Sequence, residues 1–248
     1  MRKLIYIVLS CLIFACDSKD ASDCFQTSGS IIQQTVEVAN FEKILVNRDV
    51  ELILKEGNNY DVLVETGENL INDVDVVVIN NELQLTDNNN CNYVRDYGIT
   101  KVYVTAPNIK EIRSSTQFDI SSDGVLSYDR LKLLSEDFNA PESFTVGDFR
   151  LHIEIDDFEV VSNNISSFYI VGETENLKVG FFSGTGRFEG ASLVAQHVEI
   201  EHRASNDIIV NPQQSIEGEL KGTGNVIAVN EPPIIDVQEL YTGQLIFN

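Results

Sequence analysis

The amino-acid sequence predicts an all-β protein whose second half is a parallel β-helix, that is, a solenoid of stacked coils. Val, Ile, Thr, Tyr and Phe dominate the periodic segments, and Gly, Asn and Asp separate them. No segment sustains an i, i+3, i+4 apolar pattern over three helical turns. Short apolar runs recur at nearly constant intervals in the second half. These three observations together favour strands over helices and stacked repeats over an irregular fold.

Two interleaved series of apolar runs carry the repeat. A period near twenty residues with strand-like units predicts coils that cannot each bury an apolar face alone and therefore stack. A β-sandwich would also contain regular short strands, so it remains the alternative fold, and the constancy of the interval favours the solenoid. The first series begins at Phe144, Phe168, Phe188, Ile208, Val226 and Leu245, with intervals of 24, 20, 20, 18 and 19 residues, and the second begins at Leu131, Leu151, Leu177, Val198, Ile216 and Ile234.

Small polar residues occur at corresponding places in the repeat, and we expect them to form the corners of the coils. They occupy residues 121–124, 183–186, 204–207 and 222–225. Residues 245–247 are expected to complete the last coil and to leave a strand edge that is open to pairing.

The chain divides into four predicted parts. Residues 1–15 form a lipoprotein signal peptide, 16–30 a lipidated cysteine and polar tether, 31–108 an N-terminal β region, and 109–248 the repeat solenoid, with 31–248 as one continuous body in the alternative division. In the N-terminal region we expect strands at residues 44–47, 50–54, 60–65, 74–79, 82–86 and 101–105. Asn80 and Asn81 suit a tight hairpin because asparagine tolerates positive φ.

The N-terminus has the pattern of an export signal. Met1-Arg2-Lys3 is basic, residues 4–15 are almost continuously apolar, and Cys16 precedes an abrupt change to polar residues. The apolar run is too short to span a bilayer, which favours a signal over an anchor helix. Residues 13–16 resemble the bacterial lipobox, so we predict lipidation of Cys16 and attachment to the cell envelope, with the outer membrane favoured. An ordinary secretory signal with an incidental cysteine is the alternative.

Two cysteines remain once Cys11 leaves with the signal and Cys16 is acylated. Cys24 and Cys91 would then lie in an exported compartment, where an even number of cysteines favours a disulfide. Two unrelated buried thiols are the alternative.

The composition argues against several functions. The formal net charge of −22 disfavours nucleic acid and anionic lipid headgroups as partners. His152, His197 and His202 lack metal-ligand spacing, and we expect solvated strand histidines, with His197 and His202 on opposite faces of one strand. Residues 87–90 are a weak calcium candidate, since they lack the regular carboxylate spacing of a calcium loop. We predict no catalytic residue, no cofactor and no metal.

Asp156-Asp157 is the carboxylate pair that could serve a glycan-active enzyme, a hydrolase or lyase, which is the alternative function. Adjacent residues on a strand point to opposite faces, so the pair could meet one glycosidic bond only at a kink. We therefore predict a turn at this pair.

Several features in order resemble the head GIN domain family, the autotransporter-adhesin-like lipoproteins of Bacteroidetes-type bacteria. They are the lipobox, Cys24-Phe25, residues 41–46, 68–70 and 91–95, and the strand that ends at Pro107, followed by the Gly/Asn-cornered repeats. The resemblance covers roughly residues 24–248. It implies a single-stranded, right-handed β-helix in the cell envelope, and a non-enzymatic, adhesin-like binding or structural module whose partner is a glycan or a protein.

Overall fold

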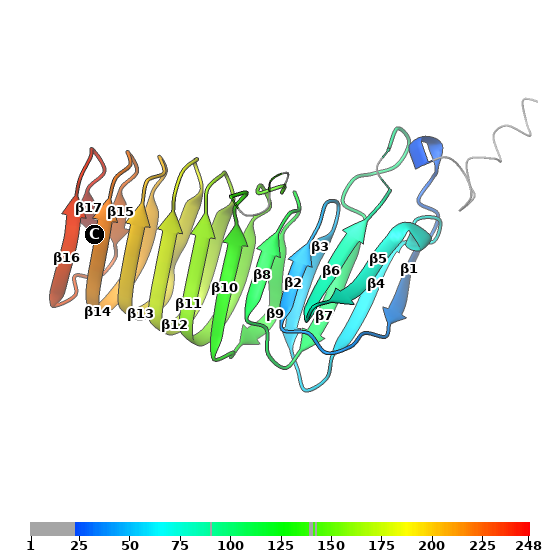
Figure 1. The fold of residues 1–248 in the computed structure, drawn as a ribbon, viewed down its shortest axis with the longest axis horizontal. Coiled ribbons are helices and arrows are strands. Elements are labelled where there is room, and N and C mark those ends of the chain that lie inside the picture. Colours follow the sequence, from blue (N-terminus) through cyan, green and yellow to red (C-terminus); the bar gives the residue numbers. More distant parts are fainter. Residues whose placement is uncertain (1–22, 90, 139–140, 142) are drawn as a thin grey trace, which may run out of the picture.

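A computed structural model describes residues 23–89, 91–138, 141 and 143–248 (Figure 1). The predicted signal residues and Cys16 therefore lie outside the described residues. Within the described part, two short 3-10 helices, η1 (Asp23–Phe25) and η2 (Ile71–Asp73), accompany seventeen strands that belong to one mixed sheet, which confirms the all-β prediction. The strands are β1 (Ile31–Val36), β2 (Lys43–Val46), β3 (Glu51–Glu56), β4 (Asp61–Gly67), β5 (Val74–Ile79), β6 (Glu82–Asp87), β7 (Lys101–Ala106), β8 (Glu111–Ser114), β9 (Ile120–Leu126), β10 (Arg130–Ser135), β11 (Phe149–Ser162), β12 (Ser167–Phe181), β13 (Arg187–His202), β14 (Ile208–Leu220), β15 (Val226–Ala228), β16 (Ile234–Glu239) and β17 (Leu245–Phe247).

The N-terminal region contains the antiparallel pairs of the sheet. β5 and β6 form the expected hairpin, in which Asn80 and Asn81 adopt φ angles of 51° and 67°. β4 lies antiparallel to both β1 and β7. β2 and β3 pair in parallel with β8 and β9, so the sheet continues from this region into the coils.

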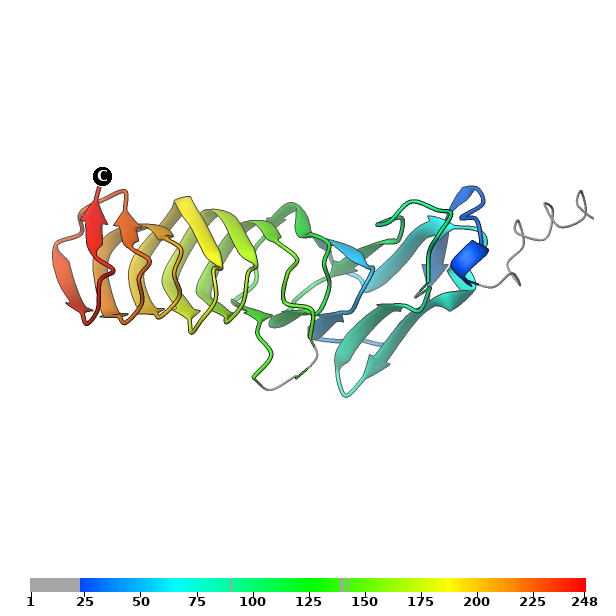
Figure 2. The same ribbon diagram turned by 90° about the horizontal axis from the view of Figure 1, so that it is seen from above.

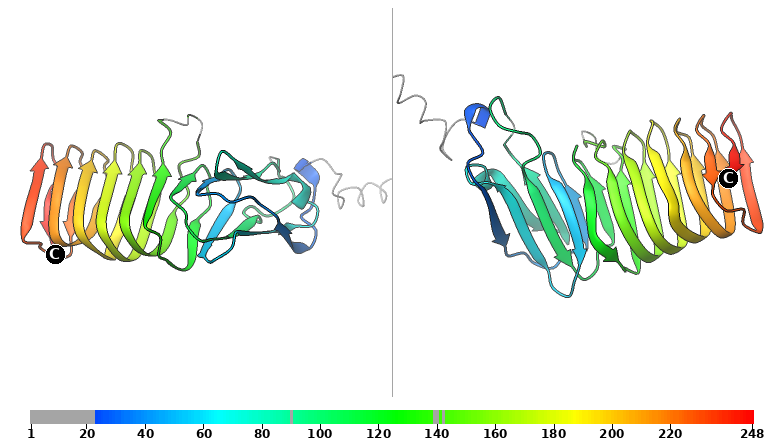
Figure 3. Two further views of the ribbon diagram at one scale, coloured as in Figure 1. Left: turned by 60° about the horizontal axis from the view of Figure 1, so that its bottom comes forward. Right: turned by 180° about the vertical axis from the view of Figure 1, so that it is seen from behind.

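The second half of the chain is a stack of coils whose strands pair in parallel with the coils on either side (Figures 1 and 2). Each of β11 to β14 bends within its length, so one strand contributes to both broad faces of the stack. Two further views show the same stack, with β16 and β17 at the end away from the N-terminal region (Figure 3). The parallel pairing of successive strands distinguishes this arrangement from the antiparallel sandwich that was the alternative.

The register corrects the predicted start of each repeat series. Phe149, and not Phe144, pairs with Phe168. β10 ends at Ser135 and β11 begins only at Phe149, so Phe144 precedes the strand. Phe158, and not Leu151, lies between Leu131 and Leu177 in the second series. That series ends at Ile235, which pairs with Ile216, instead of Ile234.

Inward-facing side chains lie directly above one another in the stack and form one apolar core. Phe149 and Phe168 stack at 4.9 Å between ring centroids and 9° between ring planes. Phe181 lies 5.7 Å from Phe168 and shares a row with His202. Aromatic pairs of this geometry contribute about 0.5–1.5 kcal/mol beyond the burial of their area. The packing therefore joins coils that would be unstable alone.

Gly172 marks a point where two neighbouring strands approach closely. Its φ of 117° lies in the region that favours glycine, and a Cβ there would meet the backbone oxygen of Ile153 at 1.9 Å. The register between β12 and β13 shifts at this place, between Tyr169 and Gly172. The glycine therefore permits the bend at which the strand passes from one face of the stack to the other.

Three of the four predicted corners connect strands, namely residues 183–186, 204–207 and 222–225. Residues 121–124 instead lie inside β9, where Gly124 has a φ of 95°. Residues 245–247 form β17, which pairs with β15 and completes the last described coil.

The residues just before β1 are packed onto the body. Gln26 is buried, and its Nε2 donates a hydrogen bond to the backbone oxygen of Asn69 at 2.9 Å. Ser30 N donates to the carboxylate of Glu68 at 3.2 Å. These contacts shorten the predicted tether, because residues 24–30 belong to the folded body.

Candidate functional site

A groove of about 550 Å³ runs across successive coils on one broad face of the stack. Its walls are two rows of outward-facing side chains, which the parallel register aligns from strand to strand. The residues between the two rows point inward and are buried. The first row contains Arg130, Asp157, Asn176, His197 and Ser215, and the second contains Lys132, Glu159, Lys178, Glu199 and Glu217.

The second row alternates in charge and continues toward the N-terminal region through Glu111 and Lys43. Lys132 pairs with Glu159 at 3.0 Å, and Lys178 pairs with Glu199 at 2.6 Å. Lys43 pairs with Glu111 at 3.3 Å. From Lys43 to Glu199 this wall of the groove is therefore locally neutral, although the chain as a whole is strongly acidic.

The hydrogen bond to Glu199 is the largest cause that raises the pKa of Lys178 above its ordinary value, and it outweighs the opposing effect of burial. The ammonium is charged at neutral pH and is paired with Glu199 on the wall of the groove.

The first row supplies hydrogen-bonding groups between coils. Asn176 Nδ2 donates to Asp157 Oδ1 at 2.9 Å. His197 Nδ1 and Ser215 Oγ form a hydrogen bond of 2.8 Å. The groove thus presents amide, imidazole, hydroxyl and carboxylate groups in line along the axis of the stack.

The carboxylates of Asp156 and Asp157 do not meet. Both residues are exposed, at the point where β11 bends and its alternation of buried and exposed residues shifts by one. Asp157 lines the groove, whereas Asp156 lines a separate hollow of about 270 Å³ together with Glu173 and Gln196. The predicted turn is therefore a bend inside a continuous strand, and it directs the two carboxylates into different hollows.

One of the histidine predictions was wrong. His202 is buried in the core row that contains Phe181 and Leu220, and its ring lies 6.4 Å from the ring of Phe181. Burial lowers its pKa, although the backbone of Asn206 and the charge of Asp207 act in the opposite direction. His152 and His197 are exposed, and His197 faces away from His202 as expected.

The calcium candidate at residues 87–90 is internally bonded where the structure describes it. Asp87 Oδ1 accepts hydrogen bonds from Asn89 N at 2.9 Å and Asn89 Nδ2 at 2.6 Å. Asp87 Oδ2 accepts one from Thr100 Oγ1 at 2.5 Å. Over the described residues, no group of three or more His, Cys, Asp and Glu is placed to hold a metal ion.

Cys24 and Cys91 form the predicted disulfide. It joins η1 to the connection between β6 and β7, and neither cysteine lies in a strand. In the part of the chain that the structure describes, no helix is long and apolar enough to cross a membrane.

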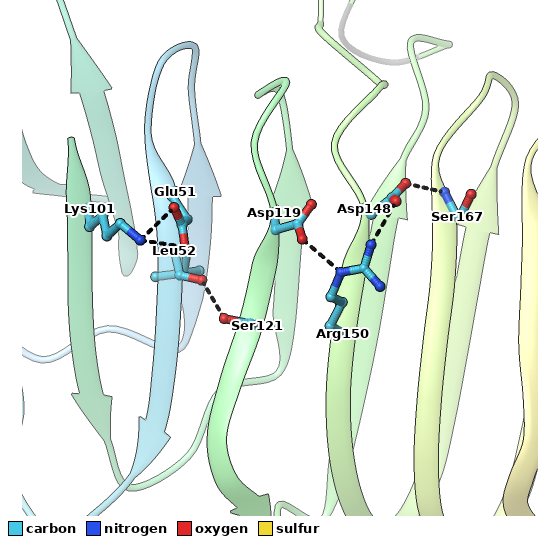
Figure 4. A network of polar contacts seen from close by, with 8 residues as sticks. All are labelled: Glu51, Leu52, Lys101, Asp119, Ser121, Asp148, Arg150 and Ser167. Atoms are coloured by element: carbon cyan, nitrogen blue, oxygen red, sulfur yellow. Dashed lines mark hydrogen bonds and ion pairs between the residues drawn. The ribbon is translucent and has the colours of Figure 1, made fainter. Parts of the chain in front are cut away.

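A second polar network lies on the other broad face and ties neighbouring strands together (Figure 4). Arg150 Nε donates to Asp119 Oδ2 at 2.7 Å, and its Nη2 donates to Asp148 Oδ2 at 3.3 Å. Its guanidinium also lies 4.2 Å from the ring centroid of Tyr169. The hydrogen bond to Asp119 is the largest cause that raises the pKa of Arg150. This arginine therefore links β11 to the residue that precedes β9 and to β12.

The groove was not predicted from the sequence. Its signal is the alternation of Lys and Glu at residues 111, 132, 159, 178 and 199, and that alternation is visible only when the coils are correctly aligned. The predicted series placed Leu151 in the row that Phe158 occupies, which hid the pairing of Lys132 with Glu159.

Comparison with known proteins identifies the family. A family model described as putative auto-transporter adhesin, head GIN domain, matches residues 40–232. The chain belongs to this head GIN domain family. The resemblance inferred from the ordered sequence features is thus confirmed. A comparison with curated protein sequences finds no match.

Solved structures share the fold of this head GIN domain protein. The structure of a putative adhesin from Bacteroides fragilis has 19% sequence identity and a TM-score of 0.79, and the match covers 90% of this chain and 99% of that one. A putative lipid binding protein from Parabacteroides distasonis has 13% identity and a TM-score of 0.60, with coverage of 88% and 97%. A putative adhesin from Parabacteroides merdae has 14% identity and a TM-score of 0.56, with coverage of 89% and 97%.

Proposed function

We propose that this head GIN domain protein is a lipid-anchored, non-enzymatic binding protein of the bacterial cell envelope, and that its groove binds an extended, uncharged glycan. This proposal includes the handedness of the fold, in which the coils form a single-stranded, right-handed β-helix. The observation that supports this proposal is the groove, whose walls hold polar and charged side chains in register on successive strands along the axis.

The chemistry of the walls favours a neutral ligand. The ammonium groups of Lys132 and Lys178 are already paired with carboxylates, so little net positive charge is available to attract an anionic polymer. Fixed pairs of donors and acceptors can instead form hydrogen bonds with hydroxyl groups. A ligand that crosses the coils would meet a new pair of side chains at each strand spacing, about 4.8 Å, with lysine and glutamate alternating along the second row as far as Glu199.

The placement of the carboxylates supports binding over glycosidic cleavage. Asp156 and Asp157 open into different hollows, so this pair cannot flank one scissile bond as acid and base. Family membership and the adhesin-like relatives are in keeping with a binding role.

A glycan array, run beside an assay for released reducing sugar, tests the proposed function. We expect binding to neutral glycans without turnover. The double variant Asn176→Ala/His197→Ala should weaken that binding, whereas Gln196→Ala, which lines the neighbouring hollow, should leave it unchanged. Release of reducing sugar would overturn the non-enzymatic assignment. Equal loss in the double variant and in Gln196→Ala would overturn the placement of the site.

The proposed anchor is tested separately at Cys16. Metabolic labelling with a palmitate analogue should mark the wild-type protein and should fail on Cys16→Ser. Label that is retained by the serine variant would overturn lipidation at this position, whatever the outcome of the glycan experiments.

A further inference from the structure

Four large apolar side chains are exposed together at the N-terminal end of the molecule. Their exposed fractions are 54% for Phe25, 74% for Tyr93, 52% for Val94 and 75% for Tyr97. The rings of Phe25 and Tyr93 lie 5.7 Å apart between centroids. We call these four residues the aromatic tip. They lie on η1 and on the connection between β6 and β7, at the opposite end of the molecule from β16 (Figure 1).

The backbone that carries the aromatic tip is fixed to η1. The disulfide between Cys24 and Cys91 joins the two segments. Tyr93 N donates a hydrogen bond to the backbone oxygen of Cys24 at 3.0 Å, next to the disulfide. Phe25 and Tyr93 are therefore held side by side by both a covalent bond and a backbone hydrogen bond.

Polar contacts hold the connection itself in shape. Asn92 Oδ1 accepts hydrogen bonds from Val94 N at 3.1 Å and from Arg95 N at 2.9 Å. The guanidinium of Arg95 donates to three backbone oxygens, those of Gln26 at 3.1 Å, Asn89 at 3.2 Å and Cys91 at 3.0 Å. The polar atoms of Asn92 and Arg95 thus bond the backbone, while the side chains of Tyr93, Val94 and Tyr97 are exposed.

An ordered segment that exposes its apolar side chains indicates an interaction surface, because such exposure is unfavourable in water. The position of the aromatic tip in the chain indicates the partner. Cys24 lies only eight positions after Cys16, and eight residue steps span at most about 29 Å when fully extended. A lipid on Cys16 therefore places a bilayer within reach of the tip.

The chemistry of the aromatic tip fits a neutral lipid surface. Tyrosine and other amphipathic aromatic side chains favour the boundary between headgroups and acyl chains. Asp96 is an exposed carboxylate between Val94 and Tyr97, and Arg95 is occupied by its carbonyl partners. With a net charge of −22 on the whole chain, attraction to anionic lipids cannot hold this surface on a membrane.

We propose that the aromatic tip inserts into the headgroup boundary of a zwitterionic lipid bilayer and seats the folded body end-on beside its anchor. The long axis of the coil stack then points away from the membrane, and the groove is presented at a distance from the lipid surface. The proposed docking rests on the proposed anchoring at Cys16.

Fluorescence tests the docking directly, because the chain contains no tryptophan. Tyr97→Trp places a single reporter in the aromatic tip. Tyr241→Trp, at a residue with 65% exposure near the other end of the stack, is the matched control. The full acylated chains are reconstituted into vesicles of phosphatidylethanolamine and a phosphatidylcholine brominated near the top of its acyl chains. Flotation of the vesicles measures anchoring, and blue shift with quenching of the tryptophan measures contact with lipid.

We expect both variants to float, with the tryptophan at position 97 blue-shifted and losing at least half of its emission, and the tryptophan at position 241 unaffected. Raising the salt concentration should not change the quenching, because apolar contacts do not depend on charge. Adding Tyr93→Ser and Val94→Ser to Tyr97→Trp should remove most of the quenching at position 97.

Floating vesicles with neither tryptophan quenched would overturn the docking and leave the anchor intact. Equal quenching at both positions would overturn the end-on orientation, since the body would then lie along the bilayer. Quenching that disappears at high salt would overturn the apolar mechanism. Failure of both chains to float would overturn the anchor and the docking together.

Discussion

Replacing both Cys24 and Cys91 with serine should destabilise the protein without changing its fold. The disulfide links residues 67 positions apart, and the enclosed segment contains β1 to β6. In the chain-entropy model a loop of this size restricts the unfolded chain enough to stabilise the folded state by about 4 kcal/mol. The enclosed strands β2 and β3 pair with β8 and β9, so their loosening also removes partners from the first coils.

The expected loss corresponds to a fall of about 8 °C in the melting temperature, from an unfolding entropy of about 2.1 cal/mol/K for each ordered residue. Thermal and urea unfolding followed by circular dichroism measure it. Wild-type protein treated with a reductant is the matched control, and it should melt at the same temperature as the double serine variant. An unchanged melting temperature in the double variant would refute the argument, as would a free thiol at either position found by non-reducing peptide mapping of oxidised wild-type protein.

Three further predictions concern the coils. Gly172→Ala should lower the free energy of unfolding by about 1–3 kcal/mol more than Gly124→Ala, because both incur strain at positive φ but only the first Cβ meets the backbone of Ile153; equal losses in urea unfolding would contradict this. Burial lowers the pKa of His202 in the folded state below the value of about 6.5 in the unfolded chain. The neutral form of His202 therefore contributes stability that is present in full above about pH 6.5 and is lost as the pH falls through the lowered pKa of the folded state. His202→Leu should therefore reduce the fall in melting temperature below about pH 6.5, and parallel pH profiles for variant and wild type would argue against it. Deleting residues 240–248 should lower the melting temperature by uncovering the preceding coil, and an unchanged value would count against the role of β17 in the stack.

Much of the fold was predictable because strand patterns and turn residues act locally. The hairpin at Asn80 and Asn81 follows from the tolerance of asparagine for positive φ, and the all-β class follows from alternation. The exact register of the strands was harder to predict from the sequence. Apolar residues occur at both Phe144 and Phe149, and only the space available inside the stack decides which one joins the core row.

The candidate groove depends on that register, so the groove could not be predicted from the sequence. Lys132 and Glu159 are 27 residues apart, a spacing that departs from the twenty-residue period because of the connection between β10 and β11. His202 illustrates the same limit, since its polar type predicted solvent exposure while its place between Phe181 and Leu220 put it in the core. By contrast, the disulfide was predictable, because Cys24 and Cys91 are the two cysteines that remain once Cys11 and Cys16 are assigned to the predicted signal and the acylation site.

The alternating row of the groove ends asymmetrically, and this gives the groove a direction. Toward the C-terminal end, Glu199 is followed by Glu217 and Asp236 in neighbouring strands, with no lysine between them. Every strand of the groove also runs in the same direction, so each strand contributes first to the first row and then to the second row. A polymer with chemically distinct ends would therefore form different contacts when reversed. If the groove binds the proposed glycan, the protein would favour one of the two orientations of the bound chain, and many copies displayed on one cell would hold such polymers with a common polarity.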